Sequence, residues 1–166
     1  MKSKFMTGSF ILLALTAGAG WLSFKPNFSG SWRLDTSRSI GLRPGMEIEL
    51  TVKHEGDTLE VEAKTTVPQQ PDIVQKDTYK LDGAESDFTP PQPPNAKGKR
   101  AGQWLARGNG FLITETINAP DAKGQPTTTN MTRKWILSPD GNQLTQDLYI
   151  DDARGSREVK RIFVKK

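Results

Sequence analysis

Apolar and polar residues alternate along much of this chain. The stretches 28–35, 46–53 and 59–64 each place apolar residues at every second position, with polar or charged residues between them. This period of two is typical of β-strands that have one face in a core and the other in solvent. Glu55-Gly56-Asp57, between the second and third stretches, is typical of a tight hairpin turn. The pattern therefore predicts three antiparallel strands in the first part of the chain.

The remainder of the sequence predicts further strands separated by turn residues. Pro90 to Pro94 is rich in proline, which cannot donate the hydrogen bonds of a sheet, so we expect a surface loop there. Asp82-Gly83 is expected to form a turn. Outside the first residues, no helical periodicity of useful length occurs. The predicted strands are residues 73–81, 84–89, 99–107, 111–118, 127–137, 143–151 and 156–164.

These elements indicate an all-β fold, an antiparallel up-and-down meander of about eight to ten strands. A meander of that length closes into a barrel or folds over as a sandwich, because either arrangement removes exposed strand edges.

The first 19 residues have a different character. Lys2 and Lys4 precede an unbroken apolar run from Phe10 to Leu15, and Ala17-Gly18-Ala19 supplies the small residues that a signal peptidase requires. The segment 1–19 is therefore predicted to be a hydrophobic leader helix, a signal peptide cleaved after Ala19. An uncleaved membrane anchor is the alternative, because residues 5–24 carry no charge. Either reading predicts export, with the rest of the chain periplasmic, secreted or anchored outside the cytoplasm.

The remaining sequence then divides into an arm, residues 20–27, and a barrel domain, residues 28–166. The full chain has a net charge of +4. Removing residues 1–19 takes away two lysines and no acidic residue, which leaves basic and acidic residues nearly balanced. A nucleic-acid partner is therefore not expected.

Few residues are available for catalysis or metal binding. The chain has no cysteine, which excludes disulfides and thiol catalysis, and its single histidine, His54, excludes Ser-His-Asp triads and multi-histidine metal sites. One histidine can ligate haem in a small barrel, but a structural residue beside the Gly56 turn is the favoured interpretation. We expect no enzyme activity, no catalytic residue, no metal and no cofactor.

A resemblance supports the barrel. The segment Asn27 to Asp35 resembles the Gly-x-Trp start of the first strand in lipocalins and other calycin barrels, and residues 137–145 are similar to a hairpin of uncharacterised exported bacterial lipocalin-like proteins. The resemblance implies that Gly30 and Trp32 close one end of the barrel and that Arg161, from the last strand, packs over Trp32.

Two charged residues are in phase with apolar ones. Glu115 shares its face with Phe111, Ile113 and Ile117, and Arg133 shares its face with Met131, Trp135 and Leu137. If the two strands pair, both charges project into the barrel, where they either neutralise each other or anchor a ligand. Trp104 and Trp135 are candidates for the wall of a ligand site, although core packing explains either tryptophan equally well.

The predicted function is that of an exported, monomeric, lipocalin-like protein that binds a small apolar or amphipathic ligand through Trp104, Glu115, Arg133 and Trp135. The alternative is a non-enzymatic structural or interaction domain of the cell envelope, with a solid barrel and no small-molecule ligand. The two hypotheses differ in whether the barrel contains a cavity.

Overall fold

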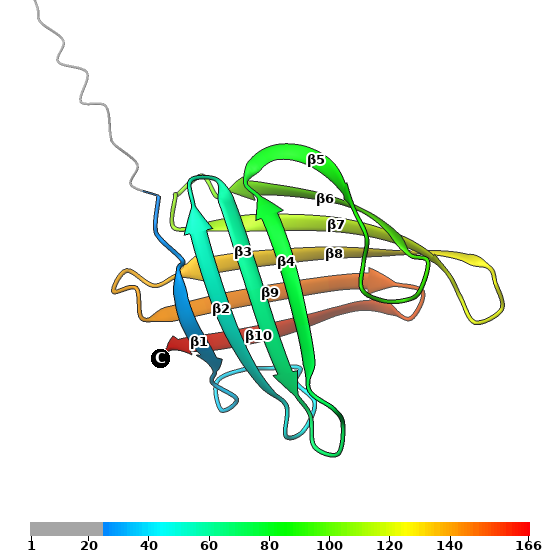
Figure 1. Cartoon of the computed structure of the whole chain (residues 1–166), viewed down its shortest axis with the longest axis horizontal. Coiled ribbons are helices and arrows are strands. Elements are labelled where there is room, and N and C mark those ends of the chain that lie inside the picture. Colours follow the sequence, from blue (N-terminus) through cyan, green and yellow to red (C-terminus); the bar gives the residue numbers. More distant parts are fainter. Residues whose placement is uncertain (1–24) are drawn as a thin grey trace, which may run out of the picture.

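The computed structural model describes residues 25–166, and this part of the chain forms ten β-strands (Figure 1). The leader prediction for residues 1–19, and most of the arm, lie outside the described residues. Within residues 25–166, no helix is long and apolar enough to cross a membrane. The strands are β1 (Gly30–Leu34), β2 (Glu47–Glu55), β3 (Thr58–Thr66), β4 (Ile73–Lys80), β5 (Asp82–Phe88), β6 (Lys97–Trp104), β7 (Gly110–Pro120), β8 (Pro126–Leu137), β9 (Gln143–Asp152) and β10 (Gly155–Lys165).

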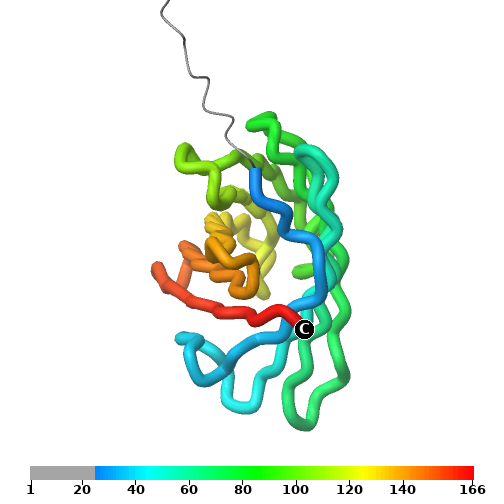
Figure 2. The backbone as a smooth tube through the Cα atoms, turned by 90° about the vertical axis from the view of Figure 1, so that its left-hand side faces the viewer, coloured from blue at the N-terminus to red at the C-terminus, as the bar shows by residue number. Residues whose placement is uncertain are grey.

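All these strands belong to one antiparallel sheet in the order β4-β3-β2-β1-β10-β9-β8-β7-β6-β5. Consecutive strands pair, except β4 with β5, and β1 also pairs with β10. In Figure 1 the strands β1–β4 cross over the strands β6–β10, and Figure 2 shows the two halves of the sheet facing each other across the interior. The predicted all-β meander is confirmed, and it forms a nearly closed barrel.

The barrel has one seam, where the edge strands β4 and β5 do not pair. The predicted turn at Asp82-Gly83 is wrong, because both residues belong to β5 and Asp82 pairs with Gln103 of β6. The chain instead passes from one edge of the sheet to the other at Leu81, which is buried. β4 also contacts β6 across the seam.

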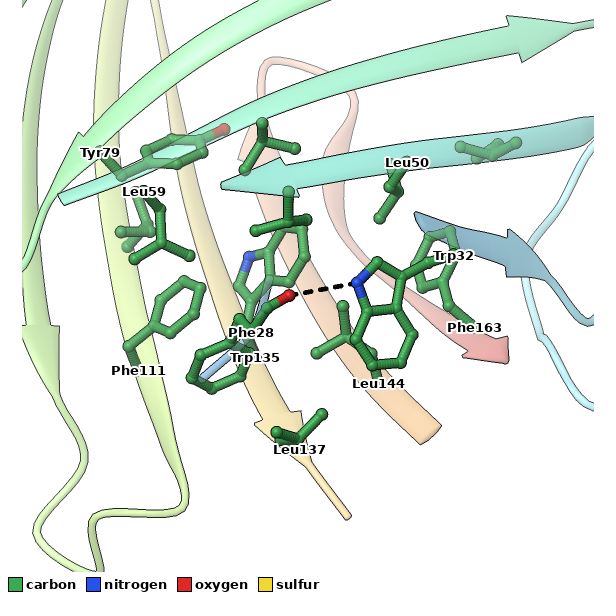
Figure 3. Close-up of a cluster of buried hydrophobic side chains, with 14 of the residues drawn as sticks. Phe28, Trp32, Leu50, Leu59, Tyr79, Phe111, Trp135, Leu137, Leu144 and Phe163 are labelled. Carbon is green, nitrogen blue, oxygen red and sulfur yellow. Dashed lines mark hydrogen bonds between the residues drawn. The ribbon is translucent and has the colours of Figure 1, made fainter. Parts of the chain in front are cut away.

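One end of the barrel, which we call the closed end, is filled by large apolar side chains (Figure 3). Phe111 and Trp135 stack with their ring centroids 5.5 Å apart, and Phe28 meets Phe111 edge-on at 4.9 Å. Trp32 donates through Nε1 to the backbone oxygen of Phe28 at 3.2 Å. Burying each side chain of this size contributes about 1.5–3 kcal/mol to stability. The closed end is therefore a packed core, to which Leu137, Leu144 and Phe163 also contribute.

The cation over Trp32 is not the expected one. Trp32 pairs directly with Lys165 of β10, and Lys165 Nζ lies 5.5 Å from the centre of the Trp32 ring. Arg161 lies four residues earlier in β10, beyond the residues that pair with β1, so the prediction that it packs over Trp32 is wrong. Gly30 allows this packing because it has no Cβ, and a Cβ there would lie only 3.1 Å from Cε of Lys165. The φ of Gly30, +143°, is also one that residues with a side chain rarely adopt.

Candidate functional site

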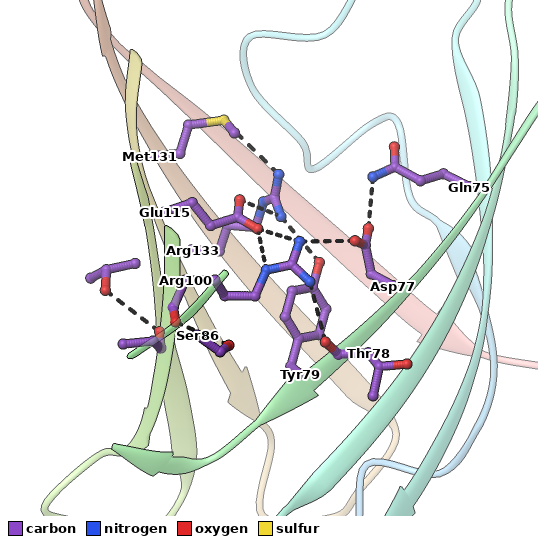
Figure 4. Close-up of polar contacts among 11 residues, drawn as sticks. Gln75, Asp77, Thr78, Tyr79, Ser86, Arg100, Glu115, Met131 and Arg133 are labelled. Atoms are coloured by element: carbon purple, nitrogen blue, oxygen red, sulfur yellow. Dashed lines mark hydrogen bonds and ion pairs between the residues drawn. The ribbon is translucent and has the colours of Figure 1, made fainter. Parts of the chain in front are cut away.

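Glu115 is a carboxylate buried inside the barrel (Figure 4). Its side chain is 1% exposed, because β7 points it inward together with Ile113. Oε1 accepts a hydrogen bond from Nε of Arg100 at 2.7 Å and lies 2.6 Å from Nη2 of the same residue. Oε2 forms an ion pair with Nη1 of Arg133 at 2.8 Å. A buried carboxylate is stable only with partners of this kind.

Arg100 carries this network across the seam between β4 and β5. Its Nη2 donates to Oδ1 of Asp77 at 2.9 Å, and its Nη1 donates to the backbone oxygen of Thr78 at 3.2 Å. The guanidinium also lies between two rings, 4.5 Å from the centre of Tyr79 and 4.0 Å from that of Phe88. The side chain of Arg100, from β6, therefore links to β4 by hydrogen bonds across the seam and also packs against Phe88 of β5.

Arg133 is the second arginine of the network. Its Nη1 donates to the hydroxyl of Tyr79 at 3.1 Å. Burial by itself lowers the pKa of Arg133, but Tyr79, Glu115 and Asp77 outweigh it and hold that pKa above its usual value. Burial raises the pKa of Tyr79 to about 12, so its hydroxyl remains protonated at neutral pH.

We call Asp77, Arg100, Glu115 and Arg133 the charge cluster. It contains two positive and two negative side chains, so its formal charges cancel. Glu115 and Arg133 both point inward and they pair with each other. Neither is therefore a free charge for a ligand.

A third arginine, Arg161, is partly buried on the inner side of the barrel, without a carboxylate within ion-pair distance among the described residues. Its Nη1 donates to Oε1 of Gln146 at 3.1 Å. Burial, together with the positive charge of Arg133, lowers the pKa of Arg161 to about 10. The arginine is still protonated at neutral pH, and its environment does not compensate its charge.

Two adjoining cavities lie beside the charge cluster. The first, which we call the inner cavity, has a volume of about 210 Å³. Its wall combines polar groups, Arg133, Gln146 and Arg161 among them, with the apolar side chains of Ile48, Leu50, Val61, Ala63, Ile73, Trp135 and Leu148.

The second, which we call the outer groove, has a volume of about 530 Å³. It is lined by the start of β4, by the Pro90 loop and by inward residues of β6–β8. Ile73 and Arg133 line both spaces, and Ile73 is 56% exposed, so both reach solvent near the start of β4. We call this the open end of the barrel.

The structure separates the four residues predicted to bind ligand. Glu115 and Arg133 lie in the charge cluster, and Trp135 is part of the core and also of the inner-cavity wall. Trp104 lies at the closed end, where its Nε1 donates to Oδ1 of Asp57 at 2.8 Å. It lines neither the inner cavity nor the outer groove, so the structure places it apart from the other three.

Sequence reasoning missed Arg100, Asp77 and Gln146. Gln146 is in phase with Leu144 and Leu148, and this alternation was a usable signal. Arg100 is in phase with Gly98 and Gly102, which do not register as apolar. These glycines leave room for neighbouring groups, since a Cβ on Gly98 would lie 2.3 Å from the ring of Phe88.

His54 lies at the end of β2, as expected. Its Nε2 is 3.1 Å from the backbone oxygen of Gly56, and its ring packs against Phe28 and Trp104. Partial burial lowers the pKa of His54. In the described part of the chain, no three histidine, aspartate or glutamate side chains gather in a way that could hold a metal ion.

The comparisons with known proteins identify the fold. No protein-family model matches the sequence, and no curated protein matches it. Among solved structures, zebrafish ileal bile acid-binding protein in complex with cholic acid matches with a TM-score of 0.50 and 16% identity, over 84% of this chain and 98% of that one. This likeness concerns the fold, and it confirms the predicted lipocalin-like, calycin-type barrel.

Proposed function

We propose that this protein is a non-enzymatic binding protein that holds a small apolar or amphipathic molecule inside its barrel. The observation that carries the proposal is the division of the interior. The closed end is packed with aromatic and aliphatic side chains, whereas the other half contains the inner cavity and the outer groove.

The chemistry of the two spaces suits such a ligand. Small-molecule sites are mostly apolar concave spaces of about 300–1,000 Å³ with a few fixed polar groups. The outer groove falls in that range, and the inner cavity extends it between the apolar residues of β2–β4 and those of β8 and β9. The structural neighbour, a barrel of the same fold, was solved with cholic acid, an amphipathic molecule.

Calorimetric titration with 1-dodecanol, an uncharged amphiphile, tests the proposal. We expect saturable binding to the wild-type protein. Ala63→Phe places a ring in the inner cavity and is expected to weaken binding at least tenfold, because the cavity is too small to hold both. Ala84→Phe, at an exposed position of β5, is the matched control and should bind as the wild type does.

Absence of saturable binding by the wild-type protein would refute the proposal and leave the alternative, an interaction domain without a ligand. Urea unfolding of both variants checks that a loss of binding does not arise from unfolding. Sedimentation of the titrated protein tests the accompanying proposal that it is a monomer.

Export is part of the proposal and rests on the sequence of residues 1–19. The mass of the protein recovered from the medium or the periplasm tests it. We expect the mass of a chain that begins at Gly20. Recovery of the complete chain in the cytoplasm would contradict export, and its recovery in the membrane would indicate the anchor.

A further inference from the structure

The outer face of the barrel carries one exposed aromatic ring. Tyr149 of β9 is 45% exposed, and within residues 25–166 it is the only aromatic residue that is largely exposed. Leu148, its neighbour in the strand, lines the inner cavity, so the period of two directs Tyr149 outward. The ring therefore belongs neither to the core nor to the wall of the inner cavity.

Tyr149 stands in a groove on this outer face, which we call the tyrosine groove. The groove has a volume of about 430 Å³ and lies over β8, β9 and β10. Tyr149 pairs directly with Thr132 of β8 and with Glu158 of β10, so the three side chains form a row across the strands. The other residues of its wall are Asn130, Ile150, Asp151, Ser156 and Arg157.

A second row of polar side chains lies beside the first. Asp151 pairs directly with Asn130 of β8 and with Ser156 of β10. Oδ1 of Asp151 accepts from the hydroxyl of Ser156 at 2.8 Å, and Oδ1 of Asn130 accepts from the hydroxyl of Thr116 at 3.1 Å. These two bonds engage only one of the two polar atoms in each side chain. Both Asn130 and Asp151 are exposed, so the second atom faces the groove or solvent.

The charged groups of the tyrosine groove are suited to hydrogen bonding. Arg157 forms an ion pair with Asp152 at 3.0 Å, so its positive charge is already compensated. Asp151 and Glu158 have no cationic side chain within ion-pair distance in the described part of the chain, and ionised carboxylates are strong acceptors for hydroxyl groups. The negative charge of Glu158 raises the pKa of Tyr149, so its hydroxyl is protonated at neutral pH and can donate.

An exposed aromatic ring among such groups matches the chemistry of a sugar. One face of a sugar ring consists of C–H groups, which pack on an aromatic ring, and its hydroxyls both donate and accept hydrogen bonds. Neighbouring strands are about 4.8 Å apart, so the polar groups on β8, β9 and β10 span roughly 10 Å, more than the width of one sugar ring. The tyrosine groove therefore has the length and the polar groups to hold a short chain of sugars.

We propose that the tyrosine groove is a binding site for an uncharged oligosaccharide, with one sugar ring packed on Tyr149. The hydroxyls of the sugars pair with Asn130, Asp151 and Glu158. This inference goes beyond the proposed function, because the tyrosine groove lies on the opposite side of the sheet from the inner cavity. The barrel then has two sites of different chemistry, an apolar one inside and a polar one outside.

The competing occupant is an organic cation, because an aromatic ring between two carboxylates also attracts an amine. Calorimetric titration separates the two occupants. The probes are three uncharged oligosaccharides, cellohexaose, maltohexaose and N-acetylchitohexaose, together with the polyamine spermidine. We expect saturable binding of at least one hexaose and none of spermidine. An excess of 1-dodecanol should leave the affinity for the hexaose unchanged, because the sheet separates the two sites.

Variants assign the binding to the tyrosine groove. Tyr149→Ala removes the ring and should weaken hexaose binding roughly five- to tenfold, the effect of losing one aromatic contact. Tyr149→Phe keeps the ring and removes the hydroxyl, so it should bind more tightly than Tyr149→Ala. Lys53→Ala removes a long exposed side chain from the outer face of β2, outside the groove, and is the control that should bind as the wild type does. Urea unfolding checks that all three variants are folded.

Absence of saturable binding of all three hexaoses to the wild-type protein would overturn this proposal, as would saturable binding of spermidine in their place. Equal hexaose affinity of Tyr149→Ala and the wild type would also overturn it. None of these results involves the inner cavity, so the proposed function is tested separately by the titration with 1-dodecanol.

Discussion

Replacing Glu115 by glutamine should destabilise the barrel strongly. Glu115→Gln preserves the shape of the side chain and removes the negative charge that pairs with Arg100 and Arg133. Arg100 then keeps its ion pair with Asp77, whereas Arg133 loses its carboxylate partner. Their side chains are 8% and 17% exposed, so solvent cannot replace the lost charge.

Breaking a buried ion pair by removing one partner costs about 3–5 kcal/mol. Glutamine retains one acceptor oxygen, so we expect the lower end of this range, about 3 kcal/mol. With a urea m value of about 2 kcal/mol/M, the midpoint of unfolding falls by roughly 1.5 M. Tryptophan fluorescence follows the transition, because Trp32 and Trp135 are buried in the core.

Glu49→Gln is the matched control. Glu49 pairs with Lys166 on the outer face of the barrel, where both side chains are about half exposed, and the midpoint should not change measurably. The double variant Glu115→Gln with Arg133→Met removes one charge of each sign and should recover part of the loss. A Glu115→Gln midpoint equal to that of Glu49→Gln would refute the claim that the charge cluster supports the fold.

Three further predictions concern other parts of the barrel. The unfolding free energy should fall as the pH drops below about 6.5, because the pKa of His54 is lowered in the folded protein and the unfolded chain binds a proton more readily. Urea unfolding between pH 5 and 8 measures this fall, and the part of it that comes from His54 should be absent from His54→Gln. Phe28→Ala should cost about 3–5 kcal/mol in the same assay, because Phe28 is completely buried at the closed end, and a loss below 1 kcal/mol would contradict this packing. Gly102→Ala should lower the melting temperature measured by circular dichroism, because a Cβ there would lie 2.2 Å from the backbone oxygen of Lys80 across the seam. An unchanged melting temperature would show that β4 does not approach β6 so closely.

The fold could be predicted from the sequence because alternation is a local signal. The stretches 46–53 and 59–64 match β2 and β3, and their shared turn lies at Gly56. The seam could not be predicted in the same way. Asp82-Gly83 has the composition of a hairpin turn, but the sheet closes by pairing β1 with β10, which leaves β4 and β5 as its edges. That pairing joins residues far apart in the sequence, and no local pattern encodes it.

Part of the candidate site could also be predicted from the local alternation of apolar and polar residues. The phase of Glu115 and Arg133 places both inside, and the structure shows that they pair. The role assigned to Arg161 followed from the resemblance, which did not give its register against β1. Four residues of strand separate Arg161 from the position opposite Trp32, and this shift moves the charge from the closed end to the inner cavity.

The indole N–H signals of the tryptophans provide the most direct test of the central claim, that the inner cavity binds a small apolar or amphipathic molecule. In a ¹H–¹⁵N spectrum, addition of 1-dodecanol should move the signal of Trp135, because the side chain of Trp135 lines the inner cavity. The signals of Trp32 and Trp104, whose Nε1 groups already donate to protein oxygens, should stay in place. A Trp135 signal that does not move at saturating 1-dodecanol would contradict the account.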